Sequence, residues 1–182
     1  MHFDSVCVFC GAQRAVATEH LELANRFGVN LAKNNRKLVY GGGDCGLMGE
    51  VANGALTEKG YVIGVFPRHL NRIEVEHKGL SRMFLVDSMH ERKFIMYQNS
   101  DVFVILPGGF GTLDEMFEVI TWRQIELHTK PVIIFNHNGY WTKLIELMEH
   151  IINEKFAKPN TRDFFQVVNT EAELYELLSM KV

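Results

Sequence analysis

The chain has 182 residues, of which 47% are hydrophobic and 23% charged, as in ordinary soluble globular proteins. Its formal net charge is −3 and both signs are mixed along the chain, which leaves no basic run to displace phosphate counterions and argues against a nucleic-acid partner. No apolar stretch approaches the roughly 20 residues that a membrane-spanning helix needs, and the N-terminus has no signal-peptide pattern. We therefore expect a cytoplasmic protein with no membrane partner.

The hydrophobic pattern switches repeatedly between strand and helix periods. In chain order we expect strands at residues 5–10, 38–40, 61–66, 83–86, 101–106, 132–135 and 165–168, and helices at 16–34, 47–57, 89–99, 112–126, 141–153 and 171–179. Residues 67–81 show little periodicity and are expected to form a long loop, of a length that is usually functional or mobile. This alternation predicts an α/β fold: one Rossmann-like nucleotide-binding domain over residues 1–182. Its doubly wound sheet would be mostly parallel, with about seven strands and helices on both faces.

The C-x-x-C pair Cys7 and Cys10 lies in the first expected strand, where residues three apart point to opposite faces. Buried strand cysteines explain this pair better than a redox or metal site does. The eight histidines show no zinc-ligand spacing, so we expect no metal.

Glycine-bearing turns follow several expected strands, at the sheet edge where ligands bind in such folds. The turn at residues 41–46 matches G-x-G-x-x-G, with Gly42, Gly43 and Gly46 as candidate contacts. The next strand ends in Phe66-Pro67 rather than in the acidic residue of a dinucleotide site, and no Walker A sequence is present. We therefore expect neither NAD nor any other cofactor.

The most informative segment is Pro107-Gly-Gly-Phe-Gly-Thr-Leu-Asp-Glu115, between the strongest strand and a helix. Glycines let backbone N–H groups approach an anion, and the helix N-terminus adds its positive dipole end. Thr112 to Glu115 also reads as a T-x-x-E capping box, which explains those two residues without a ligand. A capping box does not require the preceding glycines, so the anion-site interpretation is favoured.

A second segment, Ser88-Met-His-Glu-Arg92-Lys93, begins another expected helix with a second capping-box pattern. Arg92 and Lys93 then oppose the helix dipole, which is unfavourable unless they bind an anion. Two solvated charges are the alternative. Glu74, in the long loop, is either a solvated charge or an acceptor for a sugar or base.

These motifs, together with Gly41-Gly-Gly-Asp-Cys-Gly-Leu-Met-Gly49, resemble the Lonely-Guy family of cytokinin riboside 5′-monophosphate phosphoribohydrolases. The resemblance extends from Cys7–Gly11 to Thr121-Trp122 and Lys130-Pro131. It implies hydrolysis of the N-glycosidic bond of an adenine-type nucleoside 5′-monophosphate, with Arg92 and Glu115 as the catalytic pair. The substrate-binding positions expected from the motifs and the resemblance are Glu74, Lys93, Gly108, Gly109, Phe110, Gly111, Thr112, Leu113, Asp114, Thr121, Gly42, Gly43 and Gly46.

The family's first turn commonly reads Gly-Ser-Ser, whereas this chain has Gly11-Ala12-Gln13 and lacks those hydroxyl groups. The family has also been labelled as possible lysine decarboxylases, but no residue pattern here marks a pyridoxal-binding lysine. The resemblance further points to a homodimer, and the helix from Met116 to Ile125 is apolar over more than one stripe, as expected if it packs on a partner as well as on its own sheet. The alternatives are a nucleosidase of broader specificity and a nucleotide or cofactor carrier without turnover.

Overall fold

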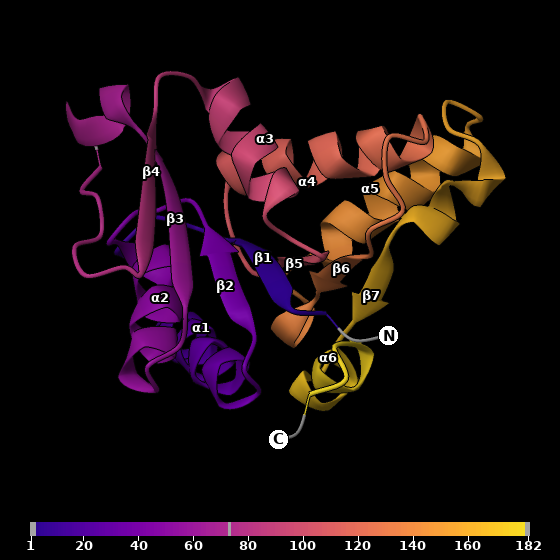
Figure 1. Cartoon of the computed structure of the whole chain (residues 1–182). Coiled ribbons are helices and arrows are strands. Elements are labelled where there is room, and N and C mark those ends of the chain that lie inside the picture. The colour runs from indigo at the N-terminus through magenta and orange to yellow at the C-terminus, as the bar shows by residue number, and fades with distance from the viewer. Residues whose placement is uncertain (1–2, 73, 181–182) are drawn as a thin grey trace.

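The computed structural model describes residues 3–72 and 74–180, and within these ranges it contains one sheet of seven strands (Figure 1). The strands are β1 (Ser5–Phe9), β2 (Lys37–Tyr40), β3 (Val62–Pro67), β4 (Arg82–Val86), β5 (Val102–Ile105), β6 (Val132–Phe135) and β7 (Gln166–Val168). Their order is β4-β3-β2-β1-β5-β6-β7, and every neighbouring pair of this sheet is parallel. The predicted Rossmann-like α/β fold is confirmed.

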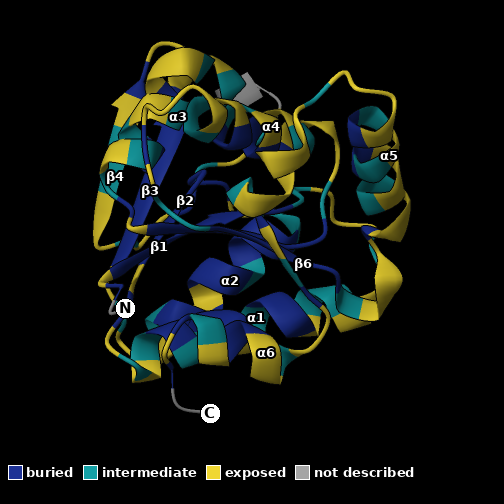
Figure 2. Ribbon diagram, turned by 90° about the vertical axis from the view of Figure 1, so that its right-hand side faces the viewer, coloured by how far each residue is buried: buried dark blue, intermediate teal, exposed yellow. Residues whose placement is uncertain are grey.

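Helices cover both faces of the sheet. They are α1 (Thr18–Lys33), α2 (Gly46–Thr57), α3 (Met89–Gln98), α4 (Phe110–Gln124), α5 (Thr142–Asn153) and α6 (Glu171–Leu177), with short 3₁₀ turns at Arg68–Arg72, His137–Gly139 and Pro159–Phe164. Figure 2 shows the buried sheet between α1, α2 and α6 on one face and α3, α4 and α5 on the other. No helix within the described residues is long and apolar enough to cross a membrane.

The alternation of side chains along β1 divides the core into two layers. Val6 and Val8 pack with α1, α2 and α6, whereas Cys7 and Phe9 pack with α3, α4 and α5. Cys10 belongs to the first layer, so Cys7 and Cys10 point to opposite faces, as the strand period predicted. Burial raises the pKa of both thiols, which keeps them protonated and unreactive.

The strand order reverses between β1 and β5, because the chain runs outward from β1 to β4 and then returns to place β5 on the other side of β1. At this switch point the two loops that leave the sheet diverge onto opposite faces and open a crevice. The loops are joined at their base by one hydrogen bond, from Gly11 N–H to the carbonyl of Pro107, at 3.0 Å.

The described residues of the expected loop at 67–81 contain more regular structure than the sequence indicated. The loop begins with the 3₁₀ turn Arg68–Arg72 and then pairs with the turn after β2, through an antiparallel bridge between Gly43 and Glu76. Such a pairing joins residues far apart in the chain, so no local periodicity signals it.

Candidate active site

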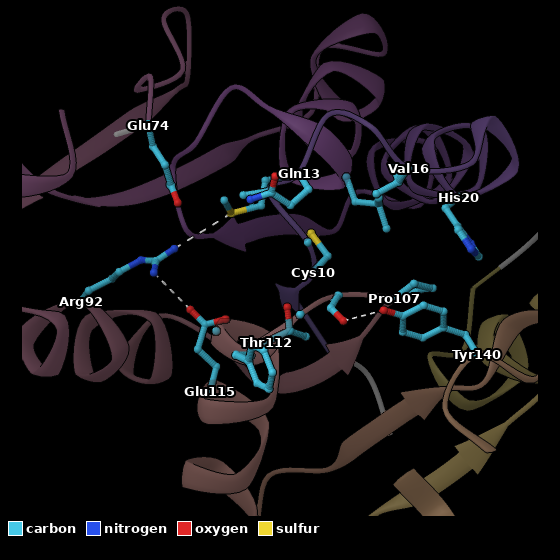
Figure 3. Close-up of a pocket in the computed structure, with 18 residues that line it drawn as sticks. Cys10, Gln13, Val16, His20, Glu74, Arg92, Pro107, Thr112, Glu115 and Tyr140 are labelled. Carbon is cyan, nitrogen blue, oxygen red and sulfur yellow. Dashed lines mark hydrogen bonds and ion pairs between the residues drawn. The ribbon is translucent and has the colours of Figure 1, made fainter. Parts of the chain in front are cut away.

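A cavity of about 370 Å³ opens at the carboxyl edge of the sheet, at the switch point (Figure 3). Figure 3 shows Glu74, Arg92 and Glu115 at one end and Val16, His20 and Tyr140 at the other. The lining residues are Cys10, Gly11, Ala12, Gln13, Val16, His20, Leu47, Met48, Glu74, Arg92, Pro107, Gly108, Gly109, Phe110, Gly111, Thr112, Glu115 and Tyr140.

The first turn of α4 lines the middle of this cavity. Gly109 is the N-cap residue, and the first helical hydrogen bond runs from Leu113 N–H to the Gly109 carbonyl, at 3.1 Å. The N–H groups of Phe110, Gly111 and Thr112 therefore precede the helical ladder, and no side chain caps the helix. Unpaired N–H groups and the positive end of the helix dipole together suit a bound anion.

The predicted capping box at Thr112 is wrong, because α4 begins two residues earlier, at Phe110. Thr112 instead packs against the backbone of Gly108, where a Cβ atom would overlap its hydroxyl oxygen. Glu115 turns away from the helix terminus, toward α3. At Ser88 the capping hydrogen bond is present: its Oγ accepts from Glu91 N–H at 3.1 Å.

Arg92, near the start of α3, is 7% exposed, and its guanidinium is fixed by backbone carbonyls. Nε donates to the carbonyl of Val65 at 3.2 Å, and Nη2 donates to the carbonyl of Gly41 at 3.3 Å. A Cβ atom on residue 41 would overlap Nη2, so the guanidinium can occupy this position only because residue 41 is glycine.

The third guanidinium nitrogen faces Glu115, with Nη1 3.3 Å from Oε1. Glu115 is 6% exposed, and burial raises its pKa although the cation of Arg92 acts in the opposite direction. A carboxylate held this way accepts a proton at higher pH than an exposed glutamate does. The pair thus combines a fixed cation with a carboxylate of increased basicity.

Glu74 approaches the same end of the cavity from the other side, opposite Glu115 (Figure 3). Its negative charge also contributes to the raised pKa of Glu115, after burial and the other neighbouring charges. Two carboxylates therefore face the space beside Arg92.

Of the residues expected to bind substrate, Glu74, Gly108, Gly109, Phe110, Gly111 and Thr112 line this cavity together with Arg92 and Glu115. The others lie outside it. Lys93 Nζ pairs with Asp114 at 3.0 Å and with Glu118 at 3.1 Å, and Leu113 packs against the hydrophobic core. Thr121 is exposed on α4.

The glycines after β2 shape the backbone rather than the cavity wall. Gly42 and Gly46 have φ angles of +79° and +58°, which L side chains rarely adopt, and Gly43 forms the bridge to Glu76. All three lie behind the lining residues rather than among them.

Sequence reasoning missed several lining residues, of which Tyr140 is the most informative. Its hydroxyl donates to the carbonyl of Gly108 at 2.7 Å and so ties the glycine turn to the segment after β6. Because Tyr140 follows an expected strand, the rule that ligands bind beyond the carboxyl ends of strands could have nominated it. Gln13 lies in the first turn and Met48 in the motif at residues 41–49, so both were near predicted positions, whereas His20 had no comparable signal.

The fold and cavity define a Rossmann-like α/β protein with an anion-binding helix terminus beside a buried arginine–carboxylate pair. A family model described as "Possible lysine decarboxylase" matches residues 48–178. The cytokinin riboside 5′-monophosphate phosphoribohydrolase of Rhodococcoides fascians is 44% identical over 159 residues, which cover 87% of this chain and 80% of that protein. The phosphoribohydrolase LOG1 of Arabidopsis thaliana is 37% identical over 176 residues, covering 97% and 83%. This chain belongs to the Lonely-Guy family.

Solved structures share the fold at lower identity. The molybdenum cofactor binding protein of Rippkaea orientalis superimposes with a TM-score of 0.72 at 21% identity, over 98% of this chain and 97% of that one. At this level of identity the likeness shows a common fold.

The description "possible lysine decarboxylase" has no counterpart in the cavity. No lysine is among the lining residues that the structure describes, and the nearby Lys93 is engaged by two carboxylates. The cavity therefore offers no amine to hold pyridoxal phosphate as a Schiff base.

Proposed function

We propose that this chain, acting as one nucleotide-binding domain, hydrolyses the N-glycosidic bond of cytokinin riboside 5′-monophosphate or AMP. The products are the free adenine-type base and ribose 5-phosphate. The observation that carries the proposal is the buried Arg92–Glu115 pair beside the uncapped N-terminus of α4. The names of the 44% and 37% identical relatives support the same reaction.

In this proposal the 5′-phosphate binds at the N-terminus of α4. The N–H groups of Phe110, Gly111 and Thr112 supply donors, and the glycines leave the backbone accessible. Tyr140 holds the Gly108 carbonyl and so keeps this turn in place. A phosphate bound there positions the ribose toward Glu115, and a nucleoside without phosphate loses this anchor.

Bond cleavage then follows from the charges at the Arg92 end. As the C1′–N bond breaks, its electron pair leaves with the base and positive charge develops on the sugar. The Glu115 carboxylate stabilises that charge and accepts a proton from the water that adds to C1′. The departing base takes up one proton from solvent and Glu115 afterwards returns its proton to solvent, so one water molecule is consumed overall. Arg92 stays protonated throughout, so its role is to orient Glu115 and to bind anionic oxygens.

We further propose that the chain acts as a homodimer through α4. Phe117 and Thr121 on α4 and Ile125, its C-cap residue, form an exposed stripe at spacings of four residues, and Phe94 on α3 is also exposed. In the dimer this stripe brings Thr121 to the partner copy rather than to its own cavity.

Sedimentation is expected to show a dimer, and Phe117→Asp is expected to give monomers; a monomeric wild type would contradict the assembly.

A cytoplasmic location is also part of the proposal. Cys7, Cys10 and Cys45 are all free thiols in the structure, which fits a reducing compartment.

Product analysis tests the reaction. Incubation with AMP or with isopentenyladenosine 5′-monophosphate is expected to yield base and ribose 5-phosphate in equal amounts, separated by chromatography. Binding of both nucleotides without any base release would instead identify a carrier. Equal turnover of guanine and pyrimidine nucleotides would indicate the broader nucleosidase.

A further inference from the structure

A short segment beside the site carries Glu74, the one residue of this segment that lines the cavity. Residues 74–77, here called the strap, lie antiparallel to the turn at residues 42–44. Asp44 N–H donates to the carbonyl of Val75 at 2.9 Å, and His77 N–H donates to the carbonyl of Gly42 at 2.9 Å. A third backbone hydrogen bond, from Glu74 N–H to the carbonyl of Leu70 at 2.8 Å, holds the other end of the strap.

The strap is also attached by one buried side chain. His77 is 7% exposed, and its Nε2 lies 3.1 Å from Oδ1 of Asn53, on α2, and 3.7 Å from Oδ1 of Asp44. Both neighbouring atoms are acceptors, so Nε2 carries the proton and donates. The other side chains of the strap contribute less, since Val75 is exposed and Glu76 is only partly buried.

The opposite end of the strap enters the cavity. Glu74 lines the cavity at the end where Arg92 lies. Its Oε2 is 3.5 Å from the position that a Cβ atom on Gly43 would take. His77 itself does not line the cavity. The imidazole is therefore outside the reach of substrate, yet it fixes the backbone three residues from a carboxylate that faces the substrate.

We propose that His77 is a positioning residue, which holds Glu74 over the Arg92–Glu115 pair by anchoring the strap to Asn53. This inference rests on the proposed function, together with the expectation from the sequence that Glu74, which lines the cavity, contacts the bound nucleotide. It assigns a role in substrate binding to a residue of α2, Asn53, that is remote from the cavity.

Three variants test whether His77 positions Glu74 or only stabilises the folded protein. His77→Ala and Asn53→Ala each remove the hydrogen bond, and each is expected to raise KM for AMP roughly fivefold, the size expected for one such bond. The value of kcat should change little, because Arg92 and Glu115 are untouched. His77→Gln places an amide donor near the former Nε2 and is expected to recover most of the loss. Melting temperatures identify any variant that is simply misfolded.

A double-mutant cycle with Glu74→Gln gives the decisive result. If His77 acts through Glu74, the double variant is no worse than Glu74→Gln alone. Additive effects of the two substitutions on KM, or a His77→Ala variant with unchanged KM, would overturn the inference. If the wild type binds AMP without turnover, the proposed function fails by itself, and the same cycle is then judged from the Kd for AMP measured by calorimetry.

Discussion

Arg92 and Glu115 come from two different helices, α3 and α4, yet their side chains meet 3.3 Å apart and each is more than nine-tenths buried. The helix α3 connects the edge strand β4 to β5 across the sheet, and α4 follows β5 on the same face, so the fold itself brings the two residues together (Figure 2). Removing two charges from water is unfavourable, and such pairs are often retained for function rather than stability.

The buried Arg92–Glu115 pair is expected to make the folded protein no more stable than an apolar pair at these positions would. Replacing both residues together, as Arg92→Met with Glu115→Leu, removes two buried charges and should leave the melting temperature unchanged or higher while activity is lost. Arg92→Met alone leaves an unpaired buried carboxylate and should be less stable than the double variant. Thermal denaturation of the three proteins measures this order, and a double variant less stable than the single one would contradict it.

The pH dependence of activity should reflect the raised pKa of Glu115. Burial raises this pKa above its ordinary value of 4.5, and the carboxylate must be ionised to act. Activity is therefore expected to fall with decreasing pH earlier than for an exposed glutamate. In Arg92→Gln, the cation that lowers this pKa is absent, so the acid limb of the residual kcat/KM should move to still higher pH. If the acid limb of kcat/KM in Arg92→Gln stays at its wild-type pH, Arg92 does not lower the pKa of Glu115.

Gly41→Ala tests how closely the backbone approaches Arg92. The added Cβ would overlap Nη2 of the guanidinium and displace it from the Gly41 carbonyl and from Glu115. We expect kcat/KM to fall by about a hundredfold, the scale of misplacing a positioning group. Phosphate binding at α4 should persist, because that site lies on another loop. Wild-type activity in Gly41→Ala would show that the guanidinium position is unimportant.

Tyr140→Phe removes the hydroxyl that holds the Gly108 carbonyl at 2.7 Å. Loss of one hydrogen bond should raise KM for the monophosphate roughly fivefold, with kcat almost unchanged. Tyr61→Phe is the matched control, since Tyr61 is half-exposed and remote from the cavity lining. Equal effects of the two substitutions on KM would show that Tyr140 does not contribute to substrate binding.

The sequence was sufficient to predict the sheet, because strands such as β5 are apolar on both faces and alternate with amphipathic helices. The turn before α4, which the glycine pattern indicated, and the pair Arg92 and Glu115, which the family resemblance implied, both line the cavity. The start of α4 was misplaced because T-x-x-E fits a local capping pattern, whereas the structure uses Gly109 as the cap and leaves Glu115 for Arg92.

Other parts of the site depend on contacts that no local pattern encodes. Lys93 resembles an anion ligand by its place in the helix, but Asp114 and Glu118 on α4 neutralise it. The strap pairs with a turn some thirty residues earlier in the chain, between Gly43 and Glu76. Tertiary neighbours of this kind determine which of several plausible residues reach the cavity.

Phosphate-dependent hydrolysis at Glu115 can be tested in one assay. Base release is measured from AMP and isopentenyladenosine 5′-monophosphate, each beside its dephosphorylated nucleoside, with wild type and Glu115→Gln. We predict release from the monophosphates alone, and a loss of roughly a hundredfold or more in kcat for Glu115→Gln with nucleotide binding retained. Equal release from the nucleosides, or an undiminished Glu115→Gln variant, would contradict this account.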